Sequence, residues 1–192
     1  MTPDVTAILV NYNAGNELAV ALRSIQSDCA QVEWEAVVVD NASSDNSAAI
    51  VETFPRATLI RNPANVGFGR AVNQAAAVAT APRLLLVNPD CRLVSGAIST
   101  LRSVLDAEPS CAVVGPRIFD PDGTVQGSAR GDPDMLTGLF GRTGALRVLL
   151  PFLPVARRNV VVEDAVRTGA SSVVVDWLSG ACMLIRRDAF TA

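Results

Sequence analysis

The stretch LLLVNPDCRL, residues 84–93, joins an apolar strand to a polar turn. Four consecutive large apolar residues are typical of a strand that is covered on both faces, as in a parallel sheet. Asn88, Pro89 and Asp90 then interrupt the run, since proline and aspartate both favour turns. In an open parallel sheet, ligands bind beyond the carboxyl ends of the strands. The stretch therefore predicts a parallel sheet with a single carboxylate, Asp90, at its binding edge.

The chain before and after this stretch alternates apolar strands with helical patterns. Strands are expected at residues 6–12, 35–40, 57–62, 83–88 and 111–119, and helices at 17–27, 44–53, 67–80 and 96–107. Strands that alternate with helices at this spacing indicate βαβ units. We therefore predict an α/β fold with a mostly parallel central sheet and helices on both faces.

The pattern changes after Phe119. A turn at 120–124 indicates a hairpin, and residues 128–170 form an irregular insertion rich in glycine, proline and arginine. Residues 172–190 return to a strand, a polar loop, a second strand and the beginning of a helix. We expect a single domain over residues 1–192, interrupted by the insertion at 128–170.

The composition excludes several classes of enzyme. The chain contains no histidine, and all sixteen basic residues are arginine, so His-based triads, P-loop lysines and Schiff-base lysines are excluded. The four cysteines are widely spaced, which favours reduced thiols over a zinc site or a redox pair. A net charge of −3 without a basic stripe argues against nucleic acid as a partner. We expect no signal peptide and no transmembrane helix, and hence a cytoplasmic protein.

Polar residues follow each of the first four expected strands, and in a parallel sheet they would share one edge. They are Asn11, Tyr12, Asn13, Asp40, Asn41, Ser43, Arg61, Asn62, Asn65, Asn88 and Asp90. Four strand ends rich in asparagine and aspartate predict a binding cleft. Each residue alone has a simpler explanation, since Asp40, Ser43 or Ser44 is suited to capping the helix that follows.

The first nucleotide-binding fold to consider is that of a Rossmann dehydrogenase. That fold requires G-x-G-x-x-G directly after the first strand. Here the first turn is NYNAGN, with one glycine, and the pair Gly67 and Gly69 after the third strand lacks the third glycine. The sequence therefore does not favour a dinucleotide site.

Five motifs in order carry a second interpretation: ILVNYN (8–13), VVVDNASSD (37–45), NPANVGFGRAVNQA (62–75), LLLVNPD (84–90) and DWLSGACMLIRR (176–187). Together they resemble the inverting family-two glycosyltransferases of the GT-A fold, nearest to the bacterial rhamnosyltransferase-like branch. The resemblance implies transfer of a sugar, with rhamnose a candidate, from a UDP- or dTDP-sugar. The implied acceptor is a cell-surface saccharide or a polyprenyl-linked saccharide. The alternative is a non-catalytic nucleotide-sugar-binding or interaction module.

The resemblance places Asn88-Pro89-Asp90 where the family has its D-x-D motif. It implies that Asp90 contacts Mg²⁺ or Mn²⁺ bound to the donor diphosphate. Asn88 stands at the family's first aspartate and is neutral, so it is suited to a hydrogen bond with ribose or sugar. The alternative for Asp90 is a turn residue that simply follows Pro89.

The resemblance also assigns the nucleotide pocket. Asp40 corresponds to the family's base-recognising carboxylate, which accepts a hydrogen bond from N3–H of uracil or thymine. Asn11 and Tyr12 would line the base and ribose, and Asn65 would shape the cleft. Arg70 would approach the diphosphate, with a surface ion pair as the alternative.

The acceptor side would involve Trp177, Ser179 and Gly180. Trp177 would stack on a sugar face or, alternatively, be an ordinary core residue. The family's general base is a carboxylate in an acidic pair, and residues 182–192 show no equivalent, so the base is expected beyond Ala192. A longer protein, a naturally short product or a fragment completed by another chain would each account for this.

Residues 136–158 carry leucines at helical spacing with flanking arginines. One interpretation is an interfacial helix at the inner face of the plasma membrane, close to a polyprenyl-linked acceptor. The alternative is a helix packed on the sheet, or a loop, because three glycines and two prolines weaken any long helix.

Overall fold

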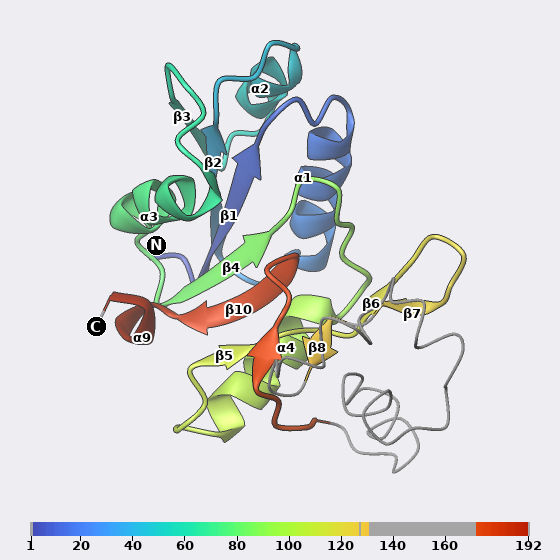
Figure 1. Cartoon of the computed structure of the whole chain (residues 1–192). Helices are drawn as coiled ribbons and strands as arrows, with labels where there is room; N and C mark the ends of the chain where they lie inside the picture. Colours follow the sequence, from blue (N-terminus) through green and yellow to red (C-terminus); the bar gives the residue numbers. More distant parts are fainter. Residues whose placement is uncertain (1, 127, 131–171, 192) are drawn as a thin grey trace, which may run out of the picture. The chain divides into compact units, whose positions relative to one another are not determined.

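The computed structural model describes residues 2–126, 128–130 and 172–191 (Figure 1). The chain divides into two compact units, one formed by Met1–Val114 with Gly180–Ala192 and the other by Gly115–Ser179. Residues 136–158 lie outside the described residues, as does most of the expected insertion. Among the helices that the structure describes, none is long and apolar enough to cross a membrane. The expectation of a single domain over residues 1–192 stays a prediction.

Six strands form the central sheet of the first unit, in the order β3-β2-β1-β4-β10-β5. Their bounds are Val5–Asn11 for β1, Trp34–Asp40 for β2, Ala57–Arg61 for β3, Arg83–Val87 for β4, Val113–Val114 for β5 and Cys182–Arg186 for β10. Strands β1 to β4 pair parallel with one another, whereas β10 is antiparallel to both β4 and β5. This confirms the mostly parallel sheet.

Helices cover both faces of this sheet, as the sequence predicts. They are α1 (Glu17–Asp28), α2 (Ser47–Ile50) with the short 3₁₀ helix η1 (Val51–Thr53), α3 (Phe68–Val78), α4 (Ala97–Ala107) and α9 (Arg187–Thr191). Figure 1 shows α1 and α3 on opposite sides of the sheet. The buried face of α3 is mostly alanine, and small side chains allow a helix to lie close to the strands.

The core beneath α3 follows from the alternation of side chains along each strand. Ile8 of β1, Val37 of β2 and Leu84 of β4 are buried in one cluster with Ala71 and Ala75 of α3. The intervening residues of the same strands, including Leu9, Val38 and Leu85, are also buried. Burial on both faces explains why these strands are apolar runs without a polar alternation.

The expected single strand over residues 111–119 is wrong. The structure has β5 at Val113–Val114 in the first unit and β6 at Ile118–Phe119 in the second. Gly115 and Pro116 separate them. Proline has no N–H to donate to a strand ladder, and a glycine weakens the strand before it, so the pairing ends at this point.

The second unit contains two short pairs of strands. Strand β6 pairs antiparallel with β7 (Val125–Gln126), and β8 (Ala129–Arg130) pairs antiparallel with β9 (Trp177–Leu178). The turn between β6 and β7 is closed by Asp120, whose backbone N–H donates to the Thr124 carbonyl at 2.8 Å. This confirms the hairpin expected around residues 120–124.

The Glu35 carboxylate on β2 joins β1 to the segment between α3 and β4 at the amino edge of the sheet. Oε1 of Glu35 accepts hydrogen bonds from Thr6 Oγ1 at 2.6 Å and from the backbone N–H and the hydroxyl of Thr80, each at 2.9 Å. Burial raises the pKa of Glu35, but these hydrogen bonds, with one from the Ala81 backbone, together outweigh it. The pKa of Glu35 is therefore lower than its ordinary value of 4.5.

We expect Glu35 to contribute stability that depends on pH. Because its pKa is lower in the folded than in the unfolded chain, the contribution is present above the unfolded pKa and is lost as pH falls through the folded pKa. Urea unfolding measured from about pH 7 to about pH 3 should therefore show a shallower loss of stability for Glu35→Gln than for the wild type. Glu52→Gln is the control, because the Glu52 side chain is exposed and forms only a long ion pair of 3.6 Å with Arg61 within the described residues. Parallel curves for Glu35→Gln and the wild type would contradict this role.

Candidate functional site

The order of the strands creates a switch point at the carboxyl edge of the first unit. From β1 the sheet extends to β2 and β3 on one side and to β4 on the other, so β1 lies between β2 and β4. Connections that leave in opposite directions open a crevice beyond the strand ends, where α/β proteins bind ligands. The end of β2 at Asp40 and the turn after β4 at Asp90 flank this crevice. Two predicted site residues are thus brought to the two sides of β1.

Asp40 is held by Asn11 at the neighbouring strand end. The register aligns Asn11 with Asp40, and the amide Nδ2 of Asn11 donates to Asp40 Oδ1 at 2.7 Å. The second oxygen, Oδ2, accepts only a long hydrogen bond of 3.4 Å from the backbone N–H of Ser43 within the described residues. The N-cap of α2 is Asn46, so Asp40, Ser43 and Ser44 do not cap that helix.

The loops after β1 and β2 are connected to each other. Oδ1 of Asn13 accepts a hydrogen bond from the Ser44 backbone at 2.7 Å, and the Gly15 N–H donates to Asp45 Oδ2 at 2.9 Å. Tyr12, between Asn11 and Asn13, is 55% exposed. The exposed ring of Tyr12 is therefore carried by a loop that hydrogen bonds fix in place.

Asn41 connects the end of β2 to the loop before α3. Its Nδ2 donates to Asn65 Oδ1 at 2.9 Å, and its Oδ1 accepts from Val66 N–H at 3.0 Å and from Asn62 Nδ2 at 3.2 Å. Asn65 also accepts a hydrogen bond from the Gly67 N–H at 2.9 Å. Asn65 thus shapes the approach to α3. The buried Asn41 is among the polar residues that the sequence places at this strand end, but its position next to Asp40 does not reveal this connecting role.

Arg70 and Gly180 both lie near the beginning of α3. Arg70 is exposed on the first turn of the helix and forms no ion pair with any residue that the structure describes. A Cβ on Gly180 would lie 3.8 Å from the ring of Phe68, the first residue of α3. Gly180 is therefore close to the helix that carries Arg70. Trp177 and Ser179 belong to the second unit, where both are half-buried and the Ser179 N–H donates to the Ser128 carbonyl at 2.7 Å.

The turn after β4 explains the polar triplet that ends this strand. The Cys91 N–H donates to the Asn88 carbonyl at 3.0 Å, which closes a turn with Pro89 and Asp90 at its centre. The Asn88 N–H in turn donates to the Ala181 carbonyl at 2.8 Å, which anchors the turn to the residue before β10. Asn88 is half-buried, whereas Asp90 is exposed. The contact recorded for its carboxylate among the described residues is a weak one, from the Cys91 thiol at 3.9 Å.

The single Asp90 carboxylate is suited to a hard divalent cation whose other ligands come from substrate and water. Burial raises the pKa of the Cys91 thiol, so this thiol stays protonated at neutral pH and is a poor metal ligand. The ligand that the turn offers to a metal ion is therefore the Asp90 carboxylate oxygen. Within the described ranges there is no group of three or more His, Cys, Asp or Glu residues that could hold a metal ion. Mg²⁺ is commonly held by one or two carboxylates together with substrate phosphates and water. Asp90 matches that arrangement.

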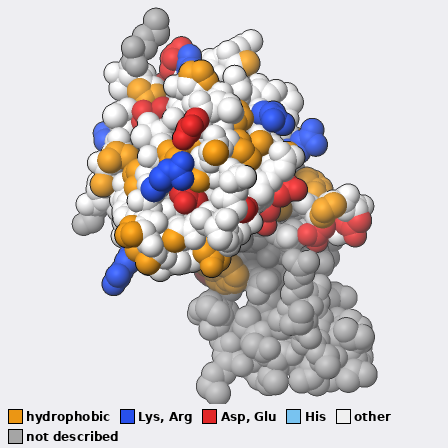
Figure 2. All heavy atoms as spheres, turned by 90° about the horizontal axis from the view of Figure 1, so that it is seen from above, with side chains coloured by type: hydrophobic (Ala, Val, Ile, Leu, Met, Phe, Trp, Pro, Cys, Tyr) orange, Lys and Arg blue, Asp and Glu red, His pale blue; other side chains and the backbone are white. Residues whose placement is uncertain are grey.

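The face of the first unit that Figure 2 shows has no large patch of one charge. Figure 2 looks down on the molecule from above, and over this unit acidic, basic and hydrophobic side chains are interspersed. Recognition of a charged ligand by this unit would therefore rest on individual charged side chains.

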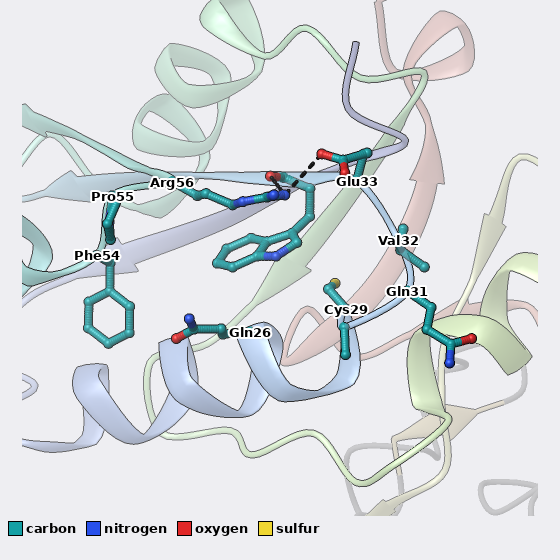
Figure 3. A pocket seen from close by; sticks show the side chains of 10 residues that line it. Gln26, Cys29, Gln31, Val32, Glu33, Phe54, Pro55 and Arg56 are labelled. Atoms are coloured by element: carbon teal, nitrogen blue, oxygen red, sulfur yellow. Dashed lines mark hydrogen bonds and ion pairs between the residues drawn. The ribbon is translucent and has the colours of Figure 1, made fainter. Parts of the chain in front are cut away.

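A cavity of about 490 Å³ lies at the opposite, amino edge of the same sheet. Figure 3 shows the Arg56 guanidinium bonded to Glu33, with Nη1 3.1 Å from Glu33 Oε2. The guanidinium carbon is 6.0 Å from the centroid of the Trp34 ring. These charged groups satisfy each other, and none of the predicted site residues lines the cavity, so the candidate site is the carboxyl edge.

Comparisons with known proteins agree on one family. The model of glycosyl transferase family 2 matches residues 6–191. A curated relative from Mycobacterium tuberculosis (strain H37Rv), N-acetylglucosaminyl-diphospho-decaprenol L-rhamnosyltransferase, is 33% identical over 204 residues, covering 99% of this chain and 64% of the relative. The chain thus spans less than two thirds of the length of that relative.

Solved structures share the fold. The mannosyltransferase PcManGT from Pyrobaculum calidifontis, in complex with GDP-Man and Mn²⁺, has a TM-score of 0.55 and 26% identity, covering 64% of this chain and 37% of that protein. Staphylococcus aureus TarS residues 1–349, in complex with UDP-GlcNAc, has a TM-score of 0.54 and 22% identity, covering 69% of this chain and 38% of that protein. The likeness to TarS shows the fold alone. Together these structures confirm the GT-A architecture.

Proposed function

The chain belongs to glycosyl transferase family 2, and we propose that it binds a nucleoside-diphosphate sugar for transfer, with inversion, to a polyprenyl-linked saccharide. The donor sugar that we favour is L-rhamnose, carried by dTDP or UDP, because the relative from M. tuberculosis is an L-rhamnosyltransferase. Its name also supplies the acceptor class, a GlcNAc-diphospho-polyprenol. We treat residues 1–192 as one nucleotide-sugar-binding domain.

The observation that carries this proposal is the pair of carboxylates on either side of β1. Asp40 ends β2, and Asp90 follows β4, with β1 between these strands. One carboxylate is buried and bound by an amide, whereas the other is exposed at the tip of a turn. A nucleotide donor needs both kinds of group: a fixed acceptor for its base, and a charged oxygen ligand near its diphosphate.

For the nucleotide, we assign base recognition to Asp40 and the edge of the ribose to Tyr12 and Asn88. Uracil and thymine present an N3–H donor, and an ionised carboxylate is an acceptor only, so the two are complementary. Arg70, exposed and without an ion pair among the described residues, would approach the diphosphate with its fork of donors. Asn65 supports this side by holding the loop that leads into α3.

For the diphosphate, we assign Asp90 as the protein ligand of Mg²⁺ or Mn²⁺. When bound, such an ion acts as a Lewis acid that stabilises the negative charge developing on the leaving nucleoside diphosphate. Asp90 would hold its carboxylate toward the crevice because Pro89 and the Asn88–Cys91 hydrogen bond fix the turn. Asn88 adds no charge, so affinity for the ion would depend strongly on the presence of the diphosphate.

For the acceptor, we assign Gly180, Ser179 and Trp177 to the wall that receives the saccharide. Inverting transfer also needs a general base that removes the proton from the attacking hydroxyl. The only acid within residues 182–192 is Asp188, in the last helix, and no acidic pair is found there. We propose that the base lies outside residues 1–192.

The proposal is tested by offering donors and an acceptor to the protein. We expect calorimetry with Mn²⁺ present to show that the 192-residue chain binds dTDP-rhamnose or a UDP-sugar. We expect a chain extended through the next acidic pair to form product with GlcNAc-diphospho-polyprenol at a rate about 10²–10⁴ times that of residues 1–192, the typical value of base catalysis.

Two outcomes would change the assignment. Robust transfer by residues 1–192 would place the base within them, with Asp176 and Asp188 as the first residues to replace. Donor binding by the extended protein without any transfer would favour a non-catalytic nucleotide-sugar-binding module.

A further inference from the structure

Asn11 is the most deeply buried polar side chain of the carboxyl edge, with 0% exposure. Nδ2 has two hydrogens and two close acceptors, Asp40 Oδ1 and Ser47 Oγ, each at 2.7 Å. Ser43 Oγ is a third, more distant acceptor at 3.0 Å. A side chain enclosed in this way cannot be a surface on which a ligand simply rests, so its influence on a ligand has to pass through its partners.

The orientation of the Asn11 amide is dictated by Asp40. Exchanging Nδ2 and Oδ1 would place two acceptor oxygens 2.7 Å apart, which an ionised carboxylate does not tolerate. The chosen orientation leaves Asn11 Oδ1 buried without a partner among the described residues. Buried amide oxygens normally accept a hydrogen bond. Residues that break this rule tend to occur at functional sites.

The hydrogen bond from Asn11 makes the two oxygens of Asp40 unequal. Oδ1 is engaged at 2.7 Å, whereas Oδ2 receives only the 3.4 Å contact from the Ser43 backbone within the part of the chain that is described. A carboxylate anchored through one oxygen cannot rotate freely and presents the other oxygen in a fixed direction. The strand register keeps this arrangement in place, because Asn11 and Asp40 are aligned at the ends of β1 and β2.

We infer that Asn11 is a positioning residue for base selection, and that Oδ2 of Asp40 is the oxygen that reads the base. This inference rests on the proposed function, because it takes Asp40 as the acceptor for the N3–H of uracil or thymine. Asn11 itself does not touch the nucleotide. It sets the direction in which the carboxylate accepts, and thereby the discrimination between uracil, which presents a donor at N3, and cytosine, which presents an acceptor.

The experiment is a double-mutant cycle on nucleotide affinity, using UDP and CDP as probes with Mn²⁺ present. We expect Asn11→Ala to weaken UDP about 10-fold, the size of one charge-assisted hydrogen bond, and to change CDP by less than about 2-fold. In the Asp40→Asn background, Asn11→Ala should change UDP affinity by less than about 2-fold, because its effect acts through the carboxylate. Asn11→Ser, whose shorter side chain cannot span to Asp40, provides the same readout if Asn11→Ala does not fold.

Ser47→Ala is the matched control, since it removes the second of the two close acceptors of Asn11 Nδ2 and leaves the bond to Asp40 in place. It should lower thermal stability and preserve the ratio of UDP to CDP affinity. Equal losses of UDP and CDP in Asn11→Ala, or a full additional loss in the Asp40→Asn background, would overturn the inference while leaving base recognition by Asp40 intact. An unchanged UDP to CDP ratio in Asp40→Asn would overturn both.

Discussion

Replacing Asp40 by asparagine is expected to lower the affinity for UDP and dTDP by about 10- to 100-fold. This corresponds to about 1.5–3 kcal/mol, the range for a hydrogen bond to a charged group. The asparagine amide can present a donor to the N3–H donor of uracil or thymine, which removes the attraction. Cytosine has an acceptor at N3, so the affinity for CDP should be spared. Calorimetric titration of the three nucleotides into the wild type and the variant gives the comparison.

Asp45→Asn is a suitable control for this experiment. Asp45 belongs to the same loop and accepts hydrogen bonds from Gly15 N–H and Ser47 N–H, at 2.9 and 3.0 Å, but it is not assigned to the base. If loosening of the loop were the cause, Asp45→Asn and Asp40→Asn would weaken all nucleotides alike. Identical losses across UDP, dTDP and CDP in Asp40→Asn would show that the residue only maintains the strand end.

Replacing Asp90 by alanine is expected to abolish the part of UDP affinity that depends on a divalent metal. The wild type should bind UDP more tightly with Mg²⁺ or Mn²⁺ than with EDTA. The variant should bind equally in both conditions, with a loss on the order of 100-fold in the presence of metal, because ion-mediated stabilisation is worth several kcal/mol. Isothermal titration of UDP into both proteins, with metal and with EDTA, measures this difference.

A second variant separates charge from turn geometry at this position. Asp90→Asn keeps a side chain that favours the turn after Pro89 and removes the negative charge. If Asp90 acts on the metal, both variants lose metal dependence and both remain folded. If it is only a turn residue, Asp90→Ala loses thermal stability, Asp90→Asn retains it, and the metal dependence of UDP binding is unchanged in Asp90→Asn. Equal affinity of the wild type with metal and with EDTA would end the metal assignment.

Most of the sheet could be predicted from the sequence because its signals are local. The apolar runs of β1, β2 and β4 are nearly continuous, since both faces of these strands are covered, and β3 at the edge of the sheet is less buried. A helix follows each of the four strands. The polar residues after these strands could be placed at one edge from the parallel order alone. The exception is the run at 111–119, where the apolar content predicts one strand but Gly115 and Pro116 divide it into β5 and β6.

The candidate site could be proposed from the sequence, but the hydrogen bonds among its side chains could not. Asp40 and Asp90 stand out because a carboxylate directly after an apolar strand is visible along the chain. The bond between Asn11 and Asp40 joins residues 29 positions apart, and Asn41 reaches Asn65 across 24 positions. Such pairs depend on strand register and on loop conformation, including the left-handed backbone of Asn13 and Ala42, which no local pattern encodes.

The sequence by itself determined the fold class and the family, because hydrophobic periodicity and ordered motifs are local features of the chain. That a donor binds at the carboxyl edge stays a prediction. Only the tertiary structure decided which polar side chains are held in hydrogen bonds within the protein and which are exposed to a ligand. Asn11 is buried and bonded to Asp40, Asn65 is engaged by Asn41, and Asp90 is exposed at the tip of its turn. The physical reason is that a hydrogen bond requires its partners within about 3 Å, and that distance is set by the packing of strands that are remote in sequence.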